Sequence, residues 1–115
     1  MQYVDGFITP VPTDKRDAYQ AFAEKNATLF KSAGALNVIE CWEDDVPAGV
    51  NTSFPLAVKK LESESVALSW IIWPSKDVRD AGWAKIMSDL MMREETPPFD
   101  GSRLIYGGFQ MIVNA

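Results

Sequence analysis

Histidine is absent from this chain of 115 residues, and cysteine occurs once, at Cys41. The lack of histidine excludes Ser-His-Asp and Cys-His catalysis and every metal site that needs an imidazole ligand. The single cysteine excludes an internal disulfide, and the N-terminus lacks the pattern of a signal peptide, so we expect a cytoplasmic protein. Any acid–base chemistry falls to Asp, Glu, Tyr, Lys or Cys41.

Long apolar runs and clustered basic charge are also missing. No run approaches the 18 or so residues of a membrane helix, so no membrane partner is expected. Eleven Lys and Arg against sixteen Asp and Glu give a net charge of −5, which argues against nucleic acid as a partner. With 47% apolar residues, the chain is typical of one soluble globular domain over 1–115.

A short sequence pattern that occurs twice marks the junctions between strands and the helices that follow them. Each copy stops a strand-like run at a proline, Pro12 or Pro74, and opens a helical pattern with Arg-Asp-Ala. Thr13 and Ser75 are the expected N-caps, and Gly34 is the expected end of the first helix. The patterns predict strands over 3–11, 35–43, 65–73 and 103–113, and helices over 14–33 and 76–92.

This order of elements predicts an α+β, ferredoxin-like βαββαβ fold, a four-stranded antiparallel sheet with both helices on one face. The segment 46–64 is too long for a hairpin loop. We expect a helical turn around Ser53-Phe54-Pro55, with a short edge strand as the alternative.

Alternation along the strands divides their side chains into two faces. One face is almost wholly apolar and the other is rich in aromatic residues, and we expect the first, purer apolar set to face the helices. We expect the second, aromatic set to be covered by another copy of the chain, because a large apolar surface left in water marks an interaction site. Two sheets packed in this way form a dimeric α/β barrel. The purer set is Val4, Gly6, Ile8, Ile39, Cys41, Val66, Leu68, Trp70, Ile72, Ile105, Phe109, Met111 and Val113. The second set is Tyr3, Phe7, Trp42, Ile71, Trp73 and Tyr106, with Asp5, Glu40, Ser69 and Gln110 among them.

The chain resembles the YbaA-like bacterial family, a domain of unknown function in the dimeric α/β-barrel superfamily. The resemblance runs nearly end to end and implies the fold and a homodimer, but no reaction and no catalytic residues. Some members carry an RNA-related label, which the acidic composition here does not support. The motifs that carry the resemblance are Tyr3-Val4-Asp5-Gly6-Phe7, Glu40-Cys41-Trp42, Ser53-Phe54-Pro55, Ser69-Trp70-Ile71-Ile72-Trp73-Pro74-Ser75, Arg79-Asp80-Ala81-Gly82, Pro98-Phe99-Asp100-Gly101 and Tyr106-Gly107-Gly108-Phe109.

The candidate site residues lie on the aromatic face. Asp5 and Glu40 are mid-strand carboxylates, each a candidate general base or polar anchor in a ligand cavity. The alternative for both is an ion pair with Arg103 or a Lys, or an exposed rim position. Trp42, Trp73 and Tyr106 are candidate ligand-binding residues, with the Tyr106 hydroxyl as a hydrogen-bond donor and a weak catalytic candidate. Their alternative role is dimer packing.

Three further features have a chemical interpretation beside a structural one, and the structural one is favoured in each. Cys41 is expected as a small buried hydrophobe rather than a nucleophile. Gly107-Gly108 marks a bulge or a close backbone approach rather than a phosphate site. Glu43-Asp44-Asp45 reads as a solvated acidic turn rather than a cation site. Neither a metal nor a cofactor is expected.

Two classes of function remain open. One is a small cofactor-free enzyme or binding protein for an apolar, aromatic molecule. The other is a structural or interaction module whose aromatic face serves only dimerisation. A pocket of about 300 Å³ or more, lined by Trp42, Trp73, Tyr106 and either Asp5 or Glu40, would favour the first class.

Overall fold

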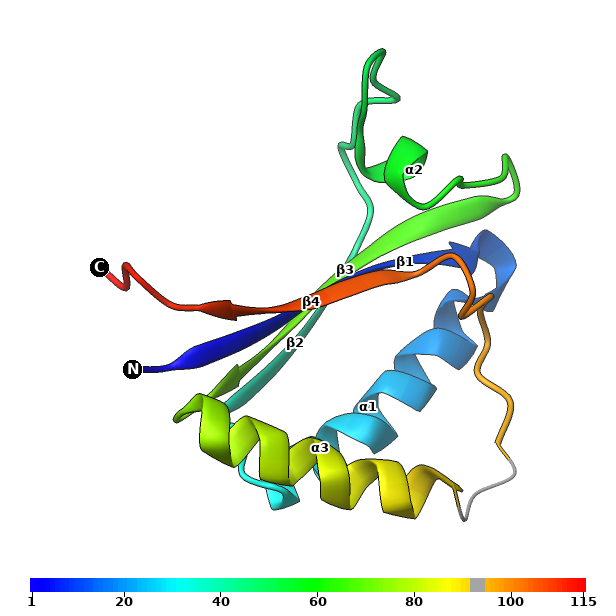
Figure 1. The fold of residues 1–115 in the computed structure, drawn as a ribbon. Coiled ribbons are helices and arrows are strands. Elements are labelled where there is room, and N and C mark those ends of the chain that lie inside the picture. Colours follow the sequence, from blue (N-terminus) through cyan, green and yellow to red (C-terminus); the bar gives the residue numbers. More distant parts are fainter. Residues whose placement is uncertain (92–94) are drawn as a thin grey trace.

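The computed structural model, which describes residues 1–91 and 95–115, has a four-stranded antiparallel sheet with two long helices on one face (Figure 1). The strands lie in the order β2-β3-β1-β4. This arrangement confirms the predicted α+β, ferredoxin-like fold. The elements are β1 (Tyr3–Pro12), α1 (Arg16–Ser32), β2 (Asn37–Trp42), the short α2 (Phe54–Ala57), β3 (Glu64–Trp73), α3 (Lys76–Met91) and β4 (Ile105–Gln110).

The repeated sequence pattern does mark the two strand-to-helix junctions, but only the second junction has the expected cap. The Ser75 hydroxyl accepts a hydrogen bond from the Val78 N–H at 3.2 Å. Thr13 does not cap α1, because its hydroxyl instead pairs with the Ser65 hydroxyl at 2.8 Å and the chain makes a 3-10 turn first. Gly34 follows α1 with a φ of +115°, the left-handed conformation that ends a helix at glycine.

The segment between β2 and β3 contains the predicted helical turn. The Ser53 hydroxyl accepts a hydrogen bond from the Leu56 N–H at 3.0 Å, which caps α2 at its start. This segment rises on the side of the sheet opposite α1 and α3, and the residues after β4 continue as an extended tail (Figure 1). β4 is shorter than the predicted 103–113, and the predicted end of the second helix at 92 lies outside the described residues.

The two faces of the sheet are the reverse of the prediction. Trp73 is 0% exposed and packs with Tyr3 and Ile71 under the helices, so the aromatic set is the inner face. The purer apolar set is the outer face, where Leu68 is 38% and Phe109 is 61% exposed. The prediction was wrong because the charged member at the centre of the aromatic set, Asp5, is hydrogen-bonded and ion-paired inside the protein, and its burial is therefore tolerated.

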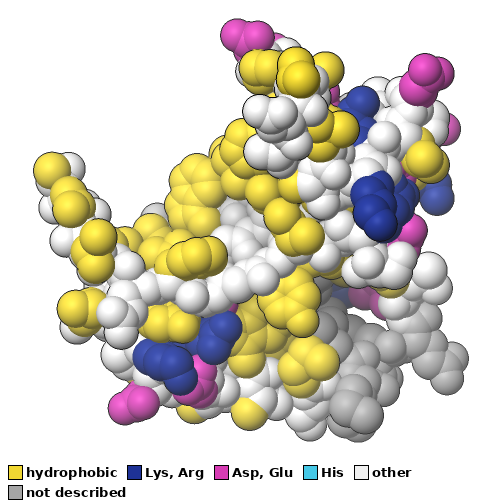
Figure 2. All heavy atoms as spheres, turned by 45° about the horizontal axis from the view of Figure 1, so that its top comes forward, with side chains coloured by type: hydrophobic (Ala, Val, Ile, Leu, Met, Phe, Trp, Pro, Cys, Tyr) yellow, Lys and Arg dark blue, Asp and Glu magenta, His cyan; other side chains and the backbone are white. Residues whose placement is uncertain are grey.

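The outer face is apolar over most of its area, and Figure 2 shows hydrophobic side chains gathered on it and on the loop above it. Gly6 and Gly107 are cross-strand partners, and the Phe109 ring lies over both of them. Within residues 1–91 and 95–115, no helix is both long and apolar enough to cross a bilayer.

Close contact between α3 and the sheet requires a glycine at position 82. A Cβ atom there would lie 2.6 and 2.8 Å from two carbons of the Trp73 ring and 3.0 Å from the Ala33 carbonyl oxygen. Gly82 therefore sets how closely the helix approaches the indole.

We expect Gly82→Ala to lower the free energy of unfolding by about 1–3 kcal/mol through overpacking, although alanine is the better helix former. Gly101→Ala is the matched control, since a Cβ there meets no atom within 4 Å. Urea denaturation of both variants checks the prediction, and equal midpoints would contradict it.

Candidate functional site

A cavity of about 600 Å³ lies between the inner face of the sheet and helices α1 and α3. This volume is within the range of small-molecule sites, about 300–1,000 Å³. Most of the wall is apolar, with a few polar side chains set into it. The apolar part includes Phe7, Phe22, Phe30, Val38, Ile71, Trp83, Ile86, Phe99 and Leu104. The polar part consists of Asp5, Thr9, Tyr19, Asn26, Glu40, Ser69, Arg79 and Tyr106.

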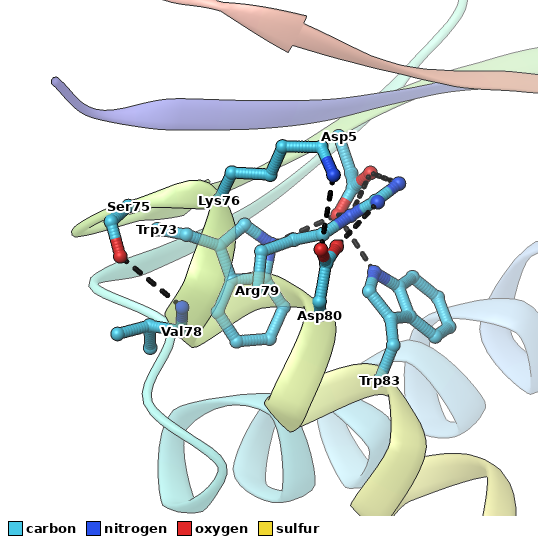
Figure 3. Close-up of polar contacts among 8 residues, drawn as sticks. All are labelled: Asp5, Trp73, Ser75, Lys76, Val78, Arg79, Asp80 and Trp83. Atoms are coloured by element: carbon cyan, nitrogen blue, oxygen red, sulfur yellow. Dashed lines mark hydrogen bonds and ion pairs between the residues drawn. The ribbon is translucent and has the colours of Figure 1, made fainter.

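One end of the cavity is closed by a buried carboxylate, Asp5 of β1, which is 3% exposed. Arg79 of α3 donates to both of its oxygens, with its Nη2 2.8 Å from Oδ1 and its Nε 3.1 Å from each. Two indole N–H groups donate to Asp5 Oδ2, from Trp73 at 2.9 Å and from Trp83 at 2.7 Å. Figure 3 shows the four side chains converging from β1, β3 and α3.

These contacts decide what Asp5 can do. An ionised carboxylate has about four lone-pair sites, and the donors around Asp5 occupy them. The guanidinium of Arg79 also contacts Asp80 and lies over the Tyr3 ring, 5.2 Å from its centroid. Hydrogen bonding to Asp5 holds the pKa of Arg79 above its usual range. Asp5 is therefore a structural anchor rather than a free base.

A second carboxylate, Glu40 of β2, lies in a more open environment. Its Oε1 accepts a hydrogen bond from the Tyr19 hydroxyl of α1 at 2.6 Å. Desolvation raises the pKa of Glu40, and the hydrogen bonds from Tyr19 and Ser69 oppose that shift. Desolvation and the neighbouring Glu40 charge raise the pKa of Tyr19 well above its usual range, so this hydroxyl stays protonated.

The Tyr19–Glu40 pair also lines a groove of about 380 Å³ between α1 and β2. Both residues border the groove and the cavity, so the pair lies where the two spaces adjoin. Of the two residues, Glu40 is exposed to solvent and Tyr19 is buried. Trp42 lines the groove and not the cavity, and the Arg16 guanidinium lies over its ring at 5.8 Å.

Asn26 of α1 contributes an unusual polar atom to the cavity wall. Its Oδ1 is buried and has no hydrogen-bond partner among the described residues. Buried side-chain oxygens are normally paired, so an orphan in a cavity wall is a place where a ligand or a water completes the bonding.

The structure brings together three of the five predicted site residues. Asp5, Glu40 and Tyr106 all line the cavity, Tyr106 at its rim with 76% exposure. Trp42 lies in the adjacent groove, and Trp73 is buried beside Asp5, so neither lines the cavity. Arg103, one of the alternative partners considered for Asp5 and Glu40, pairs with Glu64 and Asp100.

Sequence reasoning missed Tyr19 and the Arg79–Trp83 pair as site residues. Tyr19 belongs to the helix predicted over 14–33, where its spacing from other apolar residues indicates packing rather than a site. Arg79 and Trp83 are four residues apart, which places both on one side of α3, and both present N–H donors. Two such donors on the helix face that meets the sheet were the signal that this sheet face carries a buried acid.

The remaining features have structural roles or none. Cys41 is a free, exposed thiol on the outer face rather than a buried one. Gly108 is a close approach, since a Cβ there would lie 2.6 Å from the Tyr3 hydroxyl. In the part of the chain that is described, no three His, Cys, Asp or Glu side chains are grouped to hold a metal ion.

Fold and cavity together define a small ferredoxin-like α+β protein with a ligand-sized apolar cavity between its sheet and its helices. Residues 2–101 match the family described as protein of unknown function (DUF1428), and the chain belongs to this family. It is 56% identical to the uncharacterized protein YbaA of Escherichia coli strain K12, over 99% of both chains. It has the same identity and coverage with the proteins of that name from Escherichia coli O157:H7 and Shigella flexneri.

Removal of the Asp5 charge is expected to destabilise the fold strongly. Asp5→Asn leaves the Arg79 guanidinium without its buried partner, and loss of one member of such a pair lowers the free energy of unfolding by about 3–5 kcal/mol. Asp80→Asn removes the exposed carboxylate from the same guanidinium and should have little effect. Urea denaturation compares them, and equal losses would show that Asp5 is not the anchor.

Proposed function

We propose that this protein binds a small, largely apolar or aromatic molecule in the cavity between its sheet and its helices, without a cofactor. The observation that carries this proposal is the combination of an apolar wall of ligand size with two polar groups. These are the accessible carboxylate of Glu40 and the buried amide oxygen of Asn26, which has no hydrogen-bond partner among the described residues. Sites of this kind bury the apolar part of a ligand and use a few polar groups to orient it.

Binding is favoured over catalysis because the titratable groups are already engaged. Asp5 accepts hydrogen bonds from three side chains, and a base must have a free lone pair. Tyr19 keeps its proton, because its pKa is raised. Of the predicted catalytic candidates, only Glu40 and Tyr106 keep capacity to contact a ligand directly.

A cavity-filling variant tests this proposal. Ala27 lines the cavity, so Ala27→Phe should fill it and abolish binding of a neutral aromatic probe such as 1-naphthalenemethanol. Wild-type protein should show a rise in melting temperature with this probe, because a ligand that binds only the folded state stabilises it.

Ala21→Phe adds the same ring to an exposed position of the same helix and should bind like wild type. A probe that stabilises wild type and Ala27→Phe equally would rule out the cavity as the site.

We further propose that the protein is a homodimer that pairs through the outer face of the sheet, not through the aromatic face expected from the sequence. The supporting feature is the apolar surface made by Val4, Ile8, Leu68, Trp70, Ile105 and Phe109, with exposed apolar residues in the loop above it. A monomer rarely exposes an apolar patch of that extent.

The total surface area agrees with a missing partner. The chain exposes 7517 Å² at a mass of 12.8 kDa, whereas a compact monomer of this mass exposes about 6,300 Å². The excess of about 1,200 Å² is larger than the roughly 800 Å² that each partner buries in a typical stable interface. The projecting loop and the C-terminal tail account for part of this excess and border the same face (Figure 1).

Sedimentation tests the dimer. Wild type at micromolar concentration should have twice the chain mass of 12.8 kDa, and Leu68→Glu or Phe109→Glu should give a folded monomer, since a charge placed in the interface is left unpaired. Ala18→Glu adds the same charge on the exposed side of α1 and should leave the dimer intact. A wild-type monomer, or a Phe109→Glu dimer, would refute this interface.

The alternative function is a module that only dimerises, and it would be supported if no apolar probe stabilises the protein while the dimer forms.

A cytoplasmic location fits the exposed free thiol of Cys41, because a reducing compartment keeps such a group unoxidised.

A further inference from the structure

The charges that line the cavity do not balance. Three charged side chains among the described residues border it: Asp5, Glu40 and Arg79. Asp5 and Arg79 form a bidentate ion pair, and the remaining nitrogen of the guanidinium contacts Asp80. Each of the three guanidinium nitrogens of Arg79 thus already donates to a carboxylate, and its positive charge is compensated by Asp5 and Asp80. Of the three, only Glu40 has no ion-pair partner among the described residues.

Glu40 has no ion-pair partner among the described residues. Its hydrogen-bonding neighbours, the hydroxyls of Tyr19 and Ser69, are both neutral, and the Tyr19 hydroxyl donates to Glu40 Oε1 at 2.6 Å. The basic residue of the adjoining groove, Arg16, lies over Trp42 instead. No cation contributes to the pKa of Glu40, which desolvation raises. The carboxylate is therefore partly shielded from water without being neutralised by the protein.

We infer that the cavity selects apolar or aromatic molecules that carry a cationic amine, and that Glu40 is the group that binds the amine. This inference rests on the proposed function and names its ligand class. An ammonium group would donate to the Glu40 carboxylate, and the apolar body of the ligand would contact Phe22, Phe30 and the other rings of the wall. The hydrogen bond from the Tyr19 hydroxyl holds this carboxylate in place.

The same charges disfavour anionic ligands such as fatty acids and aromatic carboxylates. A carboxylate in this cavity would meet Glu40 without a free guanidinium to compensate it, and like charges in a partly desolvated site repel strongly. The net charge of −5 adds to that repulsion at long range. A neutral molecule of the same shape should bind with intermediate strength.

Three probes that share one ring system test the inference: 1-naphthylmethylamine, 1-naphthalenemethanol and 1-naphthoate. Calorimetry at pH 7 should give the amine about tenfold or more tighter binding than the alcohol, as expected for one charged hydrogen bond, and the carboxylate the weakest binding. Glu40→Gln should remove the preference for the amine over the alcohol, because the amide is neutral.

Two variants separate recognition from a merely structural role. Glu24→Gln removes a carboxylate that lines the groove but not the cavity, and it should keep the amine preference. Tyr19→Phe removes the hydrogen bond to Glu40 but not its charge, so the preference should persist. Circular dichroism confirms that each variant is folded.

The outcomes distinguish the two proposals. If the alcohol binds but the amine binds no tighter, or if Glu40→Gln keeps the preference, the ligand class is wrong and the cavity proposal stands. If none of the three probes binds wild type, both fail.

Discussion

The buried carboxylate of Asp5 is the constraint on which the rest of the structure depends. A charge in the interior is stable only where donors satisfy it, and Arg79, Trp73 and Trp83 supply them from two other elements. This one side chain therefore ties β1 to β3 and to α3. Side chains alternate along a strand, and cross-strand partners point to the same face. With Asp5 under the helices, its partner Ile71 and every second residue along β1 and β3 therefore also face the helices.

That choice of face divides the protein into two surfaces with different properties. The inner face carries aromatic rings and a few polar groups, and it leaves a cavity where the two helices diverge from the sheet. The outer face is almost purely apolar, and the described residues cover it around Val66 but leave Leu68, Ile105 and Phe109 exposed. Ligand binding on one side and pairing on the other are thus compatible, since neither proposal uses the residues of the other.

Much of the fold could be predicted from local patterns. Proline after each apolar run, Ser75 as a cap and Gly34 as a helix end mark boundaries through backbone chemistry that acts over a few residues. Asp5, Glu40 and Tyr106 were predicted together because alternation places them on one face, and they do share a cavity. Trp42 and Trp73 share that face but lie in the groove and in the core, since alternation carries no information on position across the sheet.

The sequence by itself determined the order of the elements, the membership of each strand face and the absence of histidine chemistry, because these follow from residue type and short-range periodicity. Only the tertiary structure decided which face meets the helices. The greater hydrophobicity of the purer apolar set predicted that this set would face the helices. The pairing of Asp5 with Arg79, 74 residues along the chain, outweighed that preference. Such a contact has no local signature, since it depends on where α3 packs. The same packing leaves Glu40 without an ion-pair partner among the described residues, and this makes it the candidate ligand contact.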